Sequence, residues 1–217
     1  MAFNQAAVHK RFTIAAAAYA MLVASMCAMG EERKLGGLES VLGELRKGGL
    51  VIFVRHAATE QSTREEVDLS KCETQRNLSP EGREQAAQIG EGFRTLGIPV
   101  GTVVTSPFCR CKDTAQLAFG RFSVERDLSF ALKTDAAETK RLADSLRRML
   151  STPPTDATNT IIVAHTANLQ EAASLWPKPE GAAYVFRPLA NGGFEALAKI
   201  APEEWTKVAL RRAERTH

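Results

Sequence analysis

The sequence predicts an α/β fold, a three-layer α/β/α sandwich in which helices cover both faces of a mostly parallel central sheet. Short apolar runs rich in β-branched residues alternate with amphipathic segments, each about one crossover apart. Two later runs flank Asn191-Gly192-Gly193, which is typical of an antiparallel hairpin. The expected strands are 50–54, 100–105, 122–125, 160–164, 183–187 and 193–200.

Start and stop signals place helices between these strands. Ser79 suits the N-cap position and Pro80 the first helical position, while Gly97 suits the end of the same helix. The apolar residues of this segment fall on one face, which favours packing against the sheet. The other expected helices are 38–47, a segment from Ser106-Pro107 to about 119, 136–150, 168–176 and 202–212.

The first 30 residues have the features of an export signal. His9-Lys10-Arg11 precedes an apolar run, 12–29, that contains no charged residue, and small residues stand at Ala28 and Gly30. We expect cleavage after residue 30, which leaves one domain at 31–217 in the periplasm or outside the cell, without stable membrane insertion. The alternative is an uncleaved anchor, because a run of about 18 residues approaches the length that spans a bilayer.

Length and composition bound the remaining possibilities. With 217 residues and 44% hydrophobic residues, the chain is long enough for one domain with a full core. Without residues 1–30, the chain has 26 basic and 25 acidic residues, and this near-neutrality indicates no nucleic-acid partner. The pattern leaves open whether the protein is a monomer or a dimer.

Three cysteines remain after the expected cleavage, and an oxidising compartment would permit one disulfide among them. Cys109 and Cys111 are two residues apart at the start of an expected helix, so their side chains point in different directions. The alternatives are a bridge from Cys72 to one of the two, or three free thiols. A zinc site is not indicated, because no histidine lies near them at ligand spacing.

Polar residues follow three of the expected strands at the point where each ends. Arg55-His56 follows the first, Ser106 to Arg110 follows the second and His165 follows 160–164. Ligands of open α/β sheets bind beyond the carboxyl ends of the strands, so these residues converge. Two guanidiniums can clamp a phosphoryl group while a neutral imidazole attacks phosphorus and a second, protonated imidazole donates to it. This chemistry needs neither a metal nor a cofactor.

Four motifs in this order resemble the histidine phosphatase superfamily, the family of phosphoglycerate mutases and many phosphatases. The motifs are Arg55-His56-Ala57-Ala58-Thr59, Leu78-Ser79 with Gly82, Gln85 and Ala86, Ser106-Pro107-x-x-Arg110 with Thr114-Ala115, and Val163-Ala164-His165. The resemblance implies a phosphoglycerate mutase-like fold of the branch 1 type, with His56 as nucleophile and with Arg55, Arg110 and His165 holding the phosphate.

Three further residues are candidates for substrate binding. Thr59 and Asn168 are possible contacts at the rim, although Thr59 could be an ordinary loop residue and Asn168 could cap the following helix. Arg76 lies in the segment before the Ser79 helix, which could fold over the pocket or remain a solvated loop.

The sequence also departs from the family pattern. Ala57 stands where the family has glycine, a change less expected in a mutase. The family often supplies a general acid in a Leu-x-Glu setting, and here Leu128-Ser129-Phe130 occupies that place. The carboxylates near it are Asp127, Asp135 and Glu138, and the sequence selects none of them.

The residues and the resemblance together predict a metal-independent phosphomonoesterase that acts on a phosphorylated small molecule through a phosphohistidine on His56. The alternatives are a phosphomutase of the same family, or a catalytically weak protein that only binds a phosphorylated ligand. Phosphorylated envelope sugars, other sugar phosphates and phytate-like compounds are all compatible substrates.

Overall fold

The computed structural model describes residues 35–61, 68–129 and 135–214. Contacts divide the chain into two units, Met1–Lys34 and Leu35–His217, and all the elements below belong to the second. The expected export or anchor segment at 1–30 lies outside the described residues. Across the three described stretches, no helix is both long and apolar enough to cross a membrane.

The centre of this unit is a six-stranded sheet with the order β3-β2-β4-β1-β5-β6. The first four strands in this order run parallel, and β5 and β6 run antiparallel to their neighbours. The sheet is therefore mostly parallel, as predicted, and ends in the expected hairpin. The strands are β1 (Val51–Arg55), β2 (Val100–Thr105), β3 (Ser123–Val124), β4 (Asn159–Ala164), β5 (Ala183–Pro188) and β6 (Phe194–Ile200).

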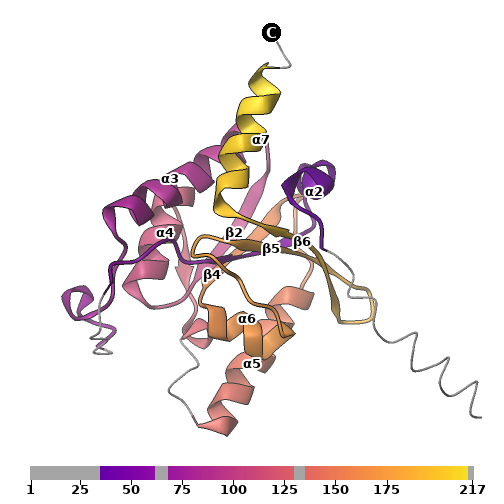
Figure 1. Cartoon of the computed structure of the whole chain (residues 1–217). Coiled ribbons are helices and arrows are strands. Elements are labelled where there is room, and N and C mark those ends of the chain that lie inside the picture. Colours follow the sequence, from indigo (N-terminus) through magenta and orange to yellow (C-terminus); the bar gives the residue numbers. More distant parts are fainter. Residues whose placement is uncertain (1–34, 62–67, 130–134, 215–217) are drawn as a thin grey trace, which may run out of the picture. The chain divides into compact units, whose positions relative to one another are not determined.

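Helices cover both faces of the sheet, which confirms the three-layer prediction. The helices α5 (Ala136–Ser151) and α6 (Thr166–Ala173) lie below the sheet in Figure 1, on the side opposite α2, α3 and α7. Short 3₁₀ turns occur at Cys72–Thr74 and Arg126–Leu128. The helices that pack on the other face are α2 (Leu38–Leu45), α3 (Pro80–Thr95), α4 (Cys109–Phe119) and α7 (Pro202–Glu214).

Strand β1 shows how the two helical layers share one sheet. Ile52 and Val54 pack into the core beneath α2, α3 and α4, whereas Val51 and Phe53 pack into the core beneath α5 and α6. All four side chains are fully buried, and each such burial stabilises the fold by about 1.5–3 kcal/mol. A continuous apolar run is thus what a parallel strand covered on both faces requires.

The predicted helix boundaries hold for α3 and shift for α6. Ser79 caps α3 by accepting a hydrogen bond from the Gly82 amide at 3.0 Å, and Gly97 follows the helix with a φ of 65°. Helix α6 begins at Thr166, two residues before the expected start, and ends at Ala173. It ends there because Ser174 adopts a left-handed backbone with a φ of 56°.

The structure decides between the cysteine alternatives. Cys72 and Cys109 form a disulfide with a Cα–Cα distance of 5.7 Å, and Cys111 is buried and free. The bridge joins the segment before α3 to the first residue of α4 across 37 residues. A loop of this length gives about 4 kcal/mol of stabilisation in the chain-entropy model.

Candidate active site

The carboxyl ends of β1, β2 and β4 meet at one edge of the sheet. Arg55 pairs with Ala164, and Thr105 pairs with Val163. The next residues in the chain are therefore neighbours: His56 after β1, Ser106 after β2 and His165 after β4. The imidazole centroids of His56 and His165 are 5.4 Å apart. The structure thus brings together residues that the sequence places more than 100 positions apart.

His56 is held as a neutral imidazole with one nitrogen available. Its Nδ1 lies 2.9 Å from the carbonyl oxygen of Ala57. Because a carbonyl can only accept, Nδ1 carries the hydrogen and Nε2 keeps its lone pair. Burial, followed by the charge of Arg110, holds the pKa of His56 well below 6.5. His56 therefore has the protonation state and the tautomer of a nucleophile.

His165 is fixed by Arg110 on one side and Ser106 on the other. Arg110 Nη2 lies 3.3 Å from His165 Nδ1 and can only donate, so Nε2 carries the hydrogen and donates to Ser106 Oγ at 2.9 Å. Burial and the Arg110 charge lower the pKa of His165 well below 6.5. The protonated form expected from the sequence is therefore not the form of the ligand-free site, although neutral His165 still presents an N–H donor.

Arg110 enters this site from the first turn of α4 and is buried, with 1% of its surface exposed. Its guanidinium carbon lies 4.6 Å above the ring of Phe108, and that ring also packs edge-on against His165 at 4.9 Å. Arg110 Nη1 reaches the carbonyl oxygen of Arg76 at 3.5 Å. Packing against an aromatic face holds the fork of donors in one orientation.

Cys111 also contacts His165, with its sulfur 3.6 Å from Nε2. Burial raises the pKa of its thiol to about 12, so the sulfur stays protonated at neutral pH. A buried neutral thiol packs as a small apolar group and is a poor nucleophile. Cys111 thus shapes the surroundings of His165 without taking part as a thiolate.

Glu180 is a member of the site that the sequence analysis missed. Its Oε1 accepts from Arg55 Nη2 at 3.0 Å and lies 3.8 Å from Arg76 Nη2. The same oxygen lies 4.0 Å from His56 Nδ1. One carboxylate thus contacts two guanidiniums and the candidate nucleophile.

The direction of β5 explains why Glu180 was overlooked. Ala183, the first residue of β5, pairs with Val54 near the carboxyl end of β1. An antiparallel strand begins where its parallel neighbours end. The residues before β5 therefore lie at the same edge of the sheet as His56 and His165. His56 and His165 follow strands, whereas Glu180 precedes one. The hairpin expected at 183–200 was the signal that could have pointed to Glu180, because its first strand runs antiparallel to β1.

The three candidates for substrate binding have different surroundings. Thr59 is bound to Glu180, with its amide and its hydroxyl each donating to the carboxylate at 3.0 Å. Asn168 acts as a helix cap: its Oδ1 accepts from the His165 amide at 3.2 Å and its Nδ2 donates to Ser129 O. Arg76 lies at the site through its contacts with Glu180 and Arg110.

The other motif residues hold the loop after His56. Thr114 Oγ1 accepts from the Ala57 amide at 3.0 Å and donates to Arg110 O at 2.7 Å. Gln85 Oε1 accepts from the Ala58 amide at 3.0 Å. Gly82 lies so close to this loop that a Cβ would stand 1.8 Å from Ala58 O. The four motifs are thus one physical unit, since the helical residues fix the loop that carries the nucleophile.

Residues 51–136 match the sequence model of the histidine phosphatase superfamily (branch 1). They include Arg55, His56 and Arg110, which meet His165 in the geometry above. The chain therefore resembles this superfamily over residues 51–136, the part that carries three of these four residues. No match was found among curated proteins.

Solved structures show the same fold at low sequence identity. One is the product of the open reading frame Rv3214 of Mycobacterium tuberculosis, with 17% identity and a TM-score of 0.50 over 68% of this chain and 95% of that chain. Another is a candidate alpha-ribazole-5'-P phosphatase of Escherichia coli, with 13% identity and a TM-score of 0.50 over 71% of this chain and 97% of that chain. At these identities the likeness concerns the fold alone.

The three carboxylates near the place of the Leu-x-Glu acid have other partners. Asp127 accepts hydrogen bonds from Arg141 and Ser145, which lower its pKa. Glu138 is paired with Arg141, which lowers its pKa as well, and Asp135 caps α5 through the Glu138 amide. The lowered pKa values of Asp127 and Glu138 make these two residues poor proton donors at neutral pH. The place of Phe130 lies outside the described residues.

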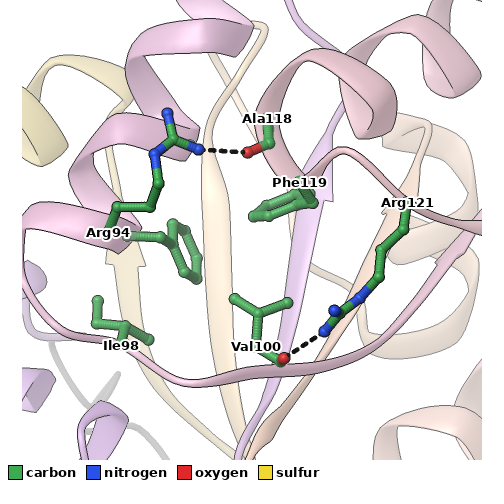
Figure 2. Close-up of a pocket in the computed structure, with 8 residues that line it drawn as sticks. Arg94, Ile98, Val100, Ala118, Phe119 and Arg121 are labelled. Atoms are coloured by element: carbon green, nitrogen blue, oxygen red, sulfur yellow. Dashed lines mark hydrogen bonds between the residues drawn. The ribbon is translucent and has the colours of Figure 1, made fainter.

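Another feature of the chain lies apart from the site. A hollow of about 220 Å³ opens at the start of β2, the end opposite Thr105, and Figure 2 shows its lining. Arg94 and Arg121 point at backbone carbonyls there, of Ala118 and of Val100. Within the described stretches, no three residues among His, Cys, Asp and Glu gather as a metal cluster.

Substituting Gly82→Ala should lower both stability and turnover. The added Cβ would force Ala58 O to move, which disturbs the loop after His56. We expect a loss of about 1–3 kcal/mol in the free energy of unfolding, measured by urea denaturation. Gly43→Ala in α2 is the matched control, since a Cβ there meets nothing within 4 Å and alanine favours the helix. Equal effects at both glycines would contradict this explanation.

The buried histidines should make stability fall in mild acid. Their folded pKa values lie below 6.5, so below that pH the unfolded chain binds protons that the folded chain does not. Stability is therefore complete above the unfolded pKa and is lost as pH falls toward the folded values. We expect a lower urea midpoint at about pH 5.5 than at about pH 7.5, and a smaller difference in His56→Asn. A midpoint that rises on acidification would contradict both assignments.

Proposed function

We propose that the protein is a metal-independent phosphomonoesterase that works through a phosphohistidine on His56. The observation that carries this proposal is the neutral His56 with Nε2 unprotonated, close to Arg55, Arg110 and His165. The match of residues 51–136 to the model of the histidine phosphatase superfamily supports the same reaction class.

The reaction follows from the tautomer of His56. In the first step, the Nε2 lone pair attacks phosphorus, the ester P–O bond breaks, and the alkoxide leaves and takes up a proton. The Nδ1 hydrogen stays on the ring and its bond to Ala57 O persists, so the product is an N-phosphoimidazolium. In the second step, water attacks phosphorus, inorganic phosphate leaves, and neutral His56 is restored.

Three guanidiniums, those of Arg110, Arg55 and Arg76, act on His56 with their charge and would face a phosphoryl group bound there. Among the residues that the structure describes, Arg55 Nε and Arg76 Nε are buried and meet no hydrogen-bond acceptor. A buried donor without a partner destabilises the fold by about 1–3 kcal/mol, and a charged donor destabilises it more. A phosphate oxygen is the acceptor that such donors bind best. These atoms support a phosphorylated small molecule as substrate, with Arg76 binding it in addition to Arg55 and Arg110.

We also propose that the protein acts in the periplasm or outside the cell. The support is the export signal expected at 1–30 and the disulfide between Cys72 and Cys109, because structural disulfides persist in oxidising compartments.

The proposal is tested by trapping the intermediate. The purified protein is mixed with p-nitrophenyl phosphate in the presence of a chelator and quenched in alkali, in which phosphohistidine survives. Mass spectrometry should then find one phosphoryl group on the peptide that contains His56. A phosphoryl group on another residue, or turnover that the chelator abolishes, would refute the mechanism.

A further inference from the structure

Glu180 has contacts that suggest more than a structural role. Within the described residues, its carboxylate interacts with Arg55, Arg76, Thr59 and His56 at distances between 3.0 and 4.0 Å. Its side chain is 22% exposed, so this charge is partly shielded from solvent. A carboxylate in such surroundings interacts with neighbouring cations more strongly than it would in bulk water.

The backbone holds Glu180 at a fixed place relative to the nucleophile. The amide of Gly181 donates to His56 O at 2.9 Å, and the amide of Arg55 donates to Ala182 O at 3.0 Å. Gly181 has a φ of 80°, and a Cβ there would stand 2.6 Å from Gln85 Oε1. Since Gln85 also binds the Ala58 amide, the turn that carries Glu180 and the loop that carries His56 are docked together.

The position of Glu180 relates to the charge that the proposed reaction creates. Phosphorylation of Nε2 leaves the His56 ring with a positive charge that Nδ1 shares, and Arg110, Arg55 and Arg76 all oppose that charge. His165 is neutral and offers no compensation. Among the described residues, Glu180 supplies a negative charge on that side of the ring, with Oε1 at 4.0 Å from Nδ1.

We propose that Glu180 is a positioning residue whose carboxylate orients Arg55 and offsets the charge that develops on His56 as the phosphohistidine forms. This inference rests on the proposed function. It assigns to Glu180 an effect on the phosphorylation step, because the carboxylate stabilises the phosphoimidazolium. The hydrolysis step removes the positive charge from the ring.

The test is Glu180→Gln. The amide retains both contacts with Thr59, because its oxygen can accept from the Thr59 amide while its NH₂ donates to Oγ1. That NH₂ cannot accept from Arg55 Nη2, so the substitution removes the negative charge and the hydrogen bond that orients Arg55, the two effects assigned to Glu180. We expect the pre-steady-state burst to slow by about 10- to 100-fold, with little change in the substrate concentration that gives the half-maximal burst rate. Hydrolysis of the preformed phosphoenzyme should not slow, because its imidazolium has become less stable. A structural defect would slow both steps together.

Two further variants make the result specific. Glu91→Gln removes a carboxylate that also joins an arginine and a threonine, Arg94 and Thr95, on the surface of α3, and should leave both steps within twofold of wild type. Glu180→Asp keeps the charge and should recover most of the burst rate. Urea midpoints of all variants report whether each one is folded.

The outcomes separate this inference from the function on which it rests. A wild-type burst with an equal burst in Glu180→Gln overturns the role of Glu180 and leaves the phosphatase assignment standing. Equal slowing of both steps, or no recovery in Glu180→Asp, also overturns it. A wild-type protein that forms no phosphoenzyme overturns the proposed function and this inference together.

Discussion

The variant His56→Ala should lose ester hydrolysis by on the order of 10⁴-fold or more in kcat/KM. Its imidazole is the group whose tautomer, pKa and position suit attack on phosphorus, because Nδ1 is committed to Ala57 O and burial keeps the ring neutral. The loss should appear in kcat, since the covalent intermediate cannot form. Hydrolysis of p-nitrophenyl phosphate by matched preparations measures it.

Binding of inorganic phosphate is the control for His56→Ala. Arg55 and Arg110 are unchanged in the variant, so calorimetry should still detect the anion. His56→Asn adds a second control, because its amide can donate to Ala57 O while lacking the nucleophile. Retention of a tenth of the activity in either variant would show that His56 is not the nucleophile. Binding without turnover in the wild type would favour the alternative of a protein that only binds its ligand.

The variant Arg110→Lys should lower kcat/KM by about 10²-fold or more, although the charge is retained. Lysine offers a point charge in place of a planar guanidinium, so it lacks the separate nitrogens that can bind His165 Nδ1 and a phosphate oxygen in a fixed geometry. Arg110 also packs on Phe108, so the substitution alters the support of His165. Steady-state kinetics should show a fall in kcat together with a rise in KM.

The matched control is Arg83→Lys. Arg83 pairs with Asp113 on the surface, and its side chain is 53% exposed. Its substitution therefore alters an exposed ion pair and leaves the site unchanged. Its kinetics should stay within twofold of wild type. If Arg110→Lys behaved in the same way, the guanidinium would not be part of the phosphate clamp.

The sequence was sufficient for most of the fold, because local signals and tertiary packing agree. Ser79, Pro80 and Gly97 delimit α3 through capping and a left-handed backbone, effects that depend on neighbouring residues only. Helix α6 was misplaced by two residues because its start depends on Asn168, which also binds Ser129 in a distant segment. Local patterns cannot reveal such a tertiary contact.

The site was predictable to the extent that one topological rule applied. His56 and His165 follow parallel strands, so the rule about carboxyl ends brought them together. Glu180 precedes an antiparallel strand, so the rule about carboxyl ends did not identify it. The pairing of Cys72 with Cys109, and not with Cys111, depends on a distance across the fold and on which side chain faces His165. Spacing along the chain does not contain that information.

The reversal of strand direction at β5 affects which residues near the candidate site can be changed without disturbing the sheet. In a wholly parallel sheet, only the segments that follow the strands lie at the edge where the strands end. Here the segment between α6 and β5 ends at that same edge, yet its residues belong to no strand or helix of the core. Exposed side chains before Glu180, such as Trp176 and Lys178, can therefore change while Glu180 and Gly181 keep their contacts with the nucleophile loop, which makes residues 174–179 the natural place to alter substrate preference by design.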